Sequence, residues 1–144
     1  MATGIAGSPR GLFHPFFTGL GGALLMAALF TDCMYYSNAL PQWSIFSTWL
    51  ILGGLILALI SAIFLLIDIL VRQGGSIRWL DFALLGGAAV LSIVNELVHT
   101  RDAWTTVVPT GMTLSAIVTI LLVIAGLRGW TVTAVRSAEK GERI

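Results

Sequence analysis

Four stretches of mostly apolar residues, separated by short polar segments, constrain the fold of this chain more than any other feature. They run from about Pro15 to Tyr36, from about Ile45 to Val71, from about Trp79 to Val98 and from about Val107 to Leu127. A helix needs roughly 20 apolar residues to cross the hydrocarbon core, where it must satisfy its own backbone hydrogen bonds. With 57% hydrophobic and only 10% charged residues, the chain is therefore predicted to be an integral membrane protein with four transmembrane helices.

The connecting segments SNALPQW, RQGGSIR and HTRDAWTTVVP are short and rich in turn-forming residues. Short connections make neighbouring spans antiparallel. The predicted fold is therefore an all-α, antiparallel four-helix transmembrane bundle over residues 15–127, with both termini on the same side. Residues 1–14 and 128–144 form the terminal segments.

The basic residues predict which side the termini face. The side of the termini carries nearly all of them, and the other side carries only Arg101. Because the more basic side of a membrane protein faces the cytoplasm, both termini are expected to be cytoplasmic. A cleaved signal peptide and a lipidated Cys33 are the alternatives for the first span. Both are disfavoured, because no small-residue cleavage site follows the span and Asp32 precedes the cysteine.

Small residues recur about once per helical turn on every predicted span. Such stripes allow close backbone contact in lipid, and we interpret them as seams within the bundle, with oligomer interfaces as the alternative. The residues are Gly19 and Ala23; Gly54, Ala58 and Ala62; Ala83 and Gly87; and Gly111, Ser115 and Thr119.

The ionisable residues of the spans are expected to lie near the two membrane surfaces. Counting 1.5 Å per residue along each span places no ionisable residue in the middle of the membrane. This argues against an ion-coupled transporter or proton pump, which needs such residues there. His14, Asp68 and Asp81 fall near the cytoplasmic ends, and Asp32, Glu96 and His99 fall near the outer ends.

His14 is followed by Pro15, a residue suited to the first turn of a helix, so His14 is expected at the helix boundary. There it can bond to Asp68, which can also pair with Arg72 one turn later. A structural polar cluster is the preferred interpretation of His14, Asp68, Arg72, Asp32, Glu96 and His99. The alternative is that His14 and Asp68 contact a cofactor, either a quinone headgroup or haem b. A haem bound by both histidines of one chain is excluded, because His14 and His99 are expected about 30 Å apart. A haem bound by one histidine and another ligand, or shared between subunits, stays an alternative.

On the outer side, Glu96 and His99 share a helix face and Asp102 follows. These are too few ligands for a metal site, so we expect none and interpret the group as a hydrated polar rim. The aromatic residues near the span ends are expected to anchor the helices at the membrane surfaces. They are Tyr35, Tyr36, Trp43, Trp49, Trp79, Trp104 and Trp130.

The chain contains no nucleophile elbow, phosphate loop or redox cysteine pair, so it is not expected to be an enzyme. Its net charge of +1 gives no basic surface for nucleic acid. A small homo-oligomeric channel is a further alternative, although only Ser115 and Thr119 could line a narrow pore.

The motifs HP at His14, LFTD ending at Asp32, Trp43 and LLIDIL around Asp68 resemble a bacterial family of small four-helix membrane proteins, domain of unknown function 2231. Many of its members carry a histidine early in the third helix, where this chain has Asp81. The resemblance implies a non-catalytic accessory subunit of a larger inner-membrane complex, with respiratory or electron-transfer complexes as candidates. Its expected partners are the lipid bilayer and other membrane subunits, with a periplasmic quinoprotein-type dehydrogenase as one candidate, and no cofactor is required. A quinone- or haem-binding redox protein that uses His14 is the rival interpretation.

Overall fold

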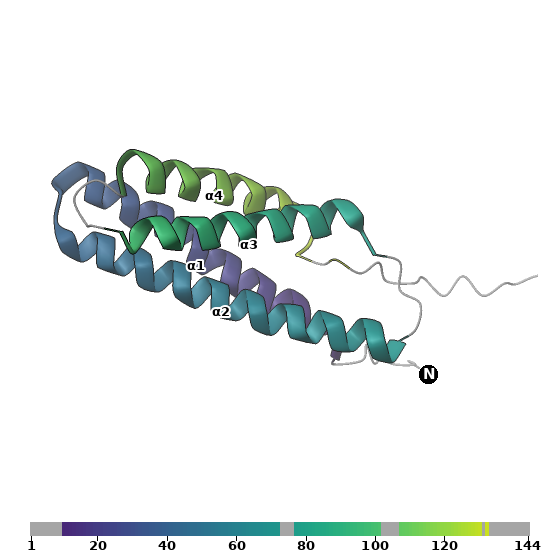
Figure 1. Cartoon of the computed structure of the whole chain (residues 1–144). Helices are drawn as coiled ribbons and strands as arrows, with labels where there is room; N and C mark the ends of the chain where they lie inside the picture. The colour runs from purple at the N-terminus through teal and green to yellow at the C-terminus, as the bar shows by residue number, and fades with distance from the viewer. Residues whose placement is uncertain (1–9, 73–76, 102–106, 131, 133–144) are drawn as a thin grey trace, which may run out of the picture.

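The computed structural model describes residues 10–72, 77–101, 107–130 and 132, and its long elements are four helices. The helices are α1 (Arg10–Asn38), α2 (Pro41–Arg72), α3 (Trp79–His99) and α4 (Met112–Leu127), with a short irregular turn, η1 (Val107–Gly111), before α4. Successive helices run in opposite directions (Figure 1). This arrangement confirms the predicted all-α antiparallel bundle.

All four helices are long and apolar enough to cross a membrane. The segments that meet this condition are Phe13–Asn38, Pro41–Ile67, Trp79–His99 and Val107–Leu127. We call the end of the bundle where α1 begins and α4 ends the proximal end, and the opposite end, where α1 turns into α2, the distal end. The side of the membrane that each end faces stays a prediction.

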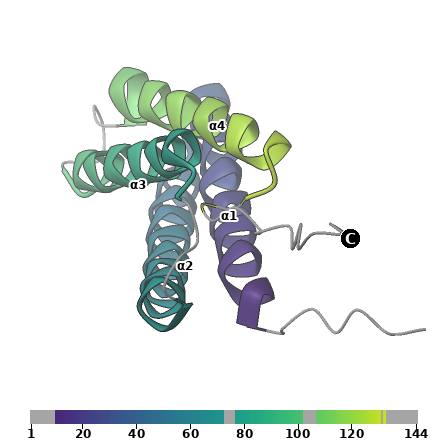
Figure 2. The ribbon, with the colours of Figure 1, turned by 90° about the vertical axis from the view of Figure 1, so that its right-hand side faces the viewer.

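The bundle consists of two helix pairs that cross each other. Helices α1 and α2 pack along each other most extensively, and α3 pairs with α4. The α3–α4 pair lies across the α1–α2 pair, and the two pairs diverge towards the proximal end (Figures 1 and 2). Between the two pairs, α1 contacts α4, and α2 contacts α3 less extensively.

A two-residue connection joins α1 to α2 at the distal end. Ala39 has a positive φ of 53°, and its backbone N–H donates to the Tyr35 carbonyl at 2.7 Å. The Asn38 side chain accepts from the N–H of Leu40 at 3.1 Å. Pro41 then begins α2, a position where its missing N–H is not needed. These local bonds make a tight reversal that brings α2 back along α1.

Helix α1 begins at Arg10, so Pro15 lies inside it, and the prediction that His14 sits at the helix boundary is wrong. The additional turn is held by a tertiary contact. The Phe64 ring on α2 stacks on Phe13 and Phe17 of α1, with centroid distances of 5.5 and 5.6 Å. Such ring pairs stabilise by about 0.5–1.5 kcal/mol beyond their burial. His14 is therefore carried on a helical face that packs against α2.

Helices α1 and α2 are tightly packed at Gly21 and Gly54. A Cβ atom added to Gly54 would lie 3.0 Å from the Gly21 carbonyl oxygen and 2.6 Å from Leu25 Cγ. Gly22, the next residue of α1, is instead covered by the indole of Trp130, which would lie 2.6 Å from a Cβ atom there. Neighbouring glycines thus serve two different contacts, one with α2 and one with the segment after α4.

The small residues singled out in the sequence are distributed unevenly over this packing. Gly54, Gly111 and Ser115 are buried, whereas Ala23, Ala62 and Ala83 are exposed. The remaining members, Gly19, Ala58, Gly87 and Thr119, are half-buried. The contact partner of Gly54 on α1 is Gly21, so the seam on α1 is rotated away from the expected line through Gly19 and Ala23.

Trp130 was expected among the surface anchors but packs into the bundle instead. A turn after α4, with positive φ at Gly129 (98°) and Trp130 (56°), folds the chain back so that the Trp130 N–H donates to the Ala125 carbonyl at 3.1 Å. The indole covers Gly22 of α1 and Gly126 of α4. It extends the central core, a cluster in the middle of the bundle formed by Leu25, Ala28, Ile51, Ala88, Val118 and Leu122.

Candidate functional site

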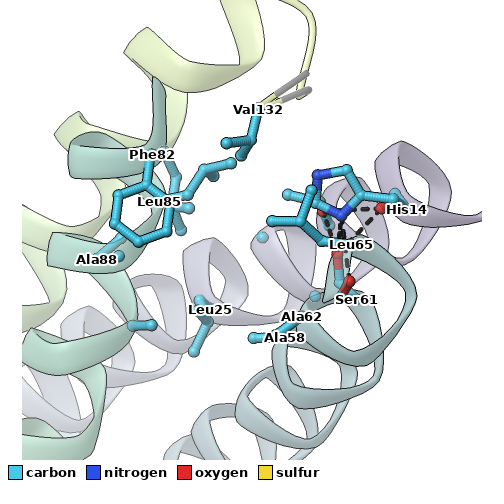
Figure 3. Close-up of a pocket in the computed structure, with 16 residues that line it drawn as sticks. His14, Leu25, Ala58, Ser61, Ala62, Leu65, Phe82, Leu85, Ala88 and Val132 are labelled. Atoms are coloured by element: carbon cyan, nitrogen blue, oxygen red, sulfur yellow. Dashed lines mark hydrogen bonds between the residues drawn. The ribbon is translucent and has the colours of Figure 1, made fainter. Parts of the chain in front are cut away.

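A cavity of about 160 Å³ lies between the two diverging helix pairs, on the proximal side of the central core. Its walls are mostly apolar and come from all four helices (Figure 3). Leu25 and Ala88 of the central core line it, and Val132, which follows α4, lines it as well. The cavity is therefore a gap between the pairs and does not lie within a single helix pair.

One wall of this cavity carries a compact group of polar side chains, His14, Thr18 and Ser61. His14 Nδ1 lies 2.7 Å from Ser61 Oγ and 3.2 Å from the Ser61 carbonyl oxygen. Thr18 Oγ1 lies 2.5 Å from Ser61 Oγ. Both hydroxyls also bond to the His14 carbonyl oxygen, Thr18 at 2.8 Å and Ser61 at 3.1 Å. These bonds fix the His14 ring against α2, and Figure 3 shows the ring at the edge of the cavity.

The predicted partner of His14, Asp68, lies farther towards the proximal end of α2 than Ser61. The side chains of Asp68 and Arg72 lie outside the part of the chain that the structure describes, so their expected pairing stays a prediction. The contact with Ser61 was not anticipated. Serine and threonine are common in membrane helices because they bond to their own backbone, and a single serine in an apolar span therefore gives little signal of its own.

The proximal end next to the cavity is held by an ionic cluster around Asp81, which is 2% exposed. Arg78 Nε lies 2.7 Å from Asp81 Oδ2, and Arg128 binds both oxygens of the same carboxylate. This hydrogen bond raises the pKa of Arg128 above its ordinary value. The backbone N–H of Arg78 donates to the Val132 carbonyl at 2.8 Å. The cluster thus fastens the chain after α4 beside the cavity.

At the distal end the structure joins Asp32 of α1 to His99 of α3. His99 Nε2 lies 3.0 Å from Asp32 Oδ1, and neither side chain is exposed to solvent. The expectation of a hydrated rim is therefore wrong for His99, because the bundle closes over it. Glu96 is half-buried, and Asp102 lies outside the described residues.

The two histidines belong to separate sites. His99 contacts Asp32, whereas His14 lies at the other end of α1, about 27 Å away at 1.5 Å per residue. Among the described residues, no group of three or more His, Cys, Asp or Glu side chains is placed to hold a metal ion. Each histidine is instead paired with side chains of a neighbouring helix.

The comparisons with known proteins give one match. The family described as predicted membrane protein (DUF2231) matches residues 12–139, most of the chain. Neither a curated protein nor a solved structure matches it. The matched range includes all four membrane-spanning helices together with His14, Asp32, Ser61 and His99. The chain therefore belongs to the DUF2231 family of predicted membrane proteins.

Proposed function

We propose that this protein is a non-catalytic membrane module that binds the ring of a small lipophilic molecule in the His14 cavity, with a quinone headgroup as the best match. The observation that carries the proposal is an apolar cavity with polar groups on one wall only. Ligand sites typically combine apolar walls with a few polar groups that orient the ligand. A quinone ring has this character, because it is flat and apolar with carbonyl oxygens that accept hydrogen bonds.

The size of the cavity favours a single ring over a haem. Its volume is about 160 Å³, and an engineered apolar cavity of about 150 Å³ in another protein binds benzene. The four linked pyrrole rings of a haem need considerably more room. The volume of the cavity therefore supports the quinone alternative for His14 over haem b.

Fluorescence quenching by a short-chain quinone analogue tests this proposal. Trp130 covers Gly22, which lines the cavity, so a bound quinone should quench its emission. Ala89→Leu fills the cavity and should abolish saturable quenching. Ala83→Leu makes the same change on the exposed face of the same helix and should leave the quenching unchanged.

The polar wall gives a second, independent measurement. Ser61→Ala removes the hydroxyl that joins His14 to Thr18, and one net hydrogen bond is worth about 0.5–1.5 kcal/mol. Without this bond the His14 ring is no longer held in place to contact the quinone, so quinone affinity should fall by about threefold to tenfold. Saturable quenching that persists in both Ala89→Leu and Ser61→Ala would contradict binding in this cavity.

The accessory role in a bacterial inner-membrane complex, including an association with a dehydrogenase, is the second part of the proposal and rests on the sequence. Identification of co-purifying chains from mild detergent by mass spectrometry tests it. A stoichiometric respiratory subunit would support it, and a homogeneous monomer or homo-oligomer would contradict it. Reporter fusions at both termini test the expected cytoplasmic orientation.

A further inference from the structure

A buried acidic residue and a buried histidine face each other near the distal end, away from the cavity described above. The side chains of Asp32 and His99 are both fully buried, and Asp32 lies about 9 Å from the end of α1. Ionisable groups at this depth are costly in a membrane, and they persist when they are paired or functional. The hydrogen bonds around Asp32 and His99 indicate which of their atoms carry a proton.

Asp32 accepts hydrogen bonds on both of its carboxyl oxygens. Ser47 of α2 donates to Oδ1 at 2.5 Å, and Ser115 of α4 donates to Oδ2 at 2.5 Å. The direction of the second bond is fixed, because the Asn95 amide nitrogen donates to Ser115 Oγ at 2.8 Å. The hydroxyl proton of Ser115 therefore points at Asp32. Short bonds from donors on both oxygens are typical of an ionised carboxylate.

His99 is placed between two acceptors. Its Nδ1 lies 2.9 Å from the Asn95 carbonyl oxygen, which can only accept, so Nδ1 carries a hydrogen. Its Nε2 lies 3.0 Å from Asp32 Oδ1, and an ionised carboxylate also only accepts. Both ring nitrogens therefore donate, and this requires the positively charged imidazolium form.

We propose that Asp32 and His99 form a buried proton-binding site, loaded with one proton on His99, and that this proton holds the four helices together at the distal end. Loss of the proton would leave the Nε2 lone pair facing Oδ1 and the Asp32 charge uncompensated inside the bundle. A buried charge without a partner is strongly destabilising. The closed distal end and the protonated site thus require each other.

The surroundings of the pair favour the same charge state. Burial opposes the imidazolium, and besides Asp32 the acidic group that interacts with His99 is Glu96 on α3, whose ionised form would favour the imidazolium. Tyr35 is a buried neighbour of Asp32 on α1. Helix α4 and η1 contain no titratable residue, and the distal half of α2 contributes hydroxyl groups. No described cation other than His99 is placed to balance Asp32.

Nitrogen-15 NMR of the full chain labelled at histidine tests the charge state without a variant of the pair. One histidine should show two protonated ring nitrogens at about pH 7.5, a pH at which free histidine has mostly lost its proton. The His14→Gln variant assigns the remaining signal to His99. A neutral His99 ring at about pH 7, or titration near pH 6.5, would overturn the proposal.

Cysteine labelling tests the mechanical role at one fixed pH. Cys33 is the only cysteine of the chain, is half-buried and follows Asp32 on α1. His99→Gln leaves Asp32 charged without a cation and should raise the maleimide labelling rate about tenfold, a typical coupling for contacting residues. The double variant Asp32→Asn/His99→Gln replaces the charged pair by neutral amides and should return the rate to within about threefold of wild type. Equal labelling of the single and double variants would show that charge does not hold this end closed.

Discussion

The contact between Gly21 and Gly54 makes the substitution Gly54→Ala a direct test of the helix packing. The new Cβ atom would lie 2.6 Å from Leu25 Cγ and 3.0 Å from the Gly21 carbonyl oxygen. The carbonyl belongs to the α1 backbone, and Leu25 is 4% exposed within the central core, so neither can move freely. The two helices must separate or Leu25 must leave its rotamer, and overpacking of this kind costs about 1–3 kcal/mol.

The same change at Gly87 provides the matched control. A Cβ atom at Gly87 would meet its nearest neighbour, Leu121 Cδ1, at 3.9 Å, which is an ordinary contact. Both glycines lie inside helices, so both substitutions gain the same roughly 0.5–1 kcal/mol of helix propensity. The propensity gain cancels in the difference between the variants, and the overpacking cost of about 1–3 kcal/mol remains.

Equilibrium unfolding in mixed micelles, followed by circular dichroism, measures this difference. Gly54→Ala should be less stable than Gly87→Ala by about 1–3 kcal/mol. If the two variants differ by less than about 0.5 kcal/mol, α1 and α2 do not approach each other at Gly21 and Gly54, and the description of this seam is wrong.

Other substitutions test the rest of the packing. Gly22→Ala would place a Cβ atom 2.6 Å from the Trp130 ring, so the indole should be displaced and its emission should shift to the red; an unchanged spectrum would argue against this contact. Ala39→Gly relieves a positive φ of 53° and should raise the free energy of unfolding by about 1 kcal/mol, whereas a loss of stability would contradict that turn. Asp81→Asn weakens the bonds to Arg128 and should lower the free energy of unfolding; an unchanged or higher stability would contradict this ion pair.

The sequence was sufficient to predict the number of helices and their antiparallel order, because hydropathy directly reports how much of the chain can cross lipid. It did not predict how each helix is rotated about its axis. Gly19 and Gly21 lie at nearly the same depth, yet Gly21 makes the contact with Gly54. A stripe of small residues indicates at which depth in the membrane a helix can be closely packed and how often the contact repeats. Which neighbouring helix the stripe faces depends on how all the helices pack.

The distal site shows the same limit more clearly. Asp32 and His99 were both expected near the outer surface, and counting residues gave a similar depth for each. Counting could not show that the two side chains face each other, nor that Ser47 and Ser115 complete the shell around Asp32. Polar residues near the end of a span suit a hydrated rim and a buried pair equally well. Only the packing of all four helices distinguishes these two arrangements.

The cavity and the proton-binding site share α1, and the distance between them limits how strongly they can influence each other. His14 and Asp32 are about 27 Å apart along the helix, and the central core lies between them. At an effective dielectric constant of about 20, a unit charge at the distal site changes the energy of a second unit charge in the cavity by about 0.6 kcal/mol. For a charged ligand this is less than a threefold change in affinity. A larger effect of the distal proton on ligand binding would therefore have to be mechanical, through a movement of α1 that changes the gap between the two helix pairs.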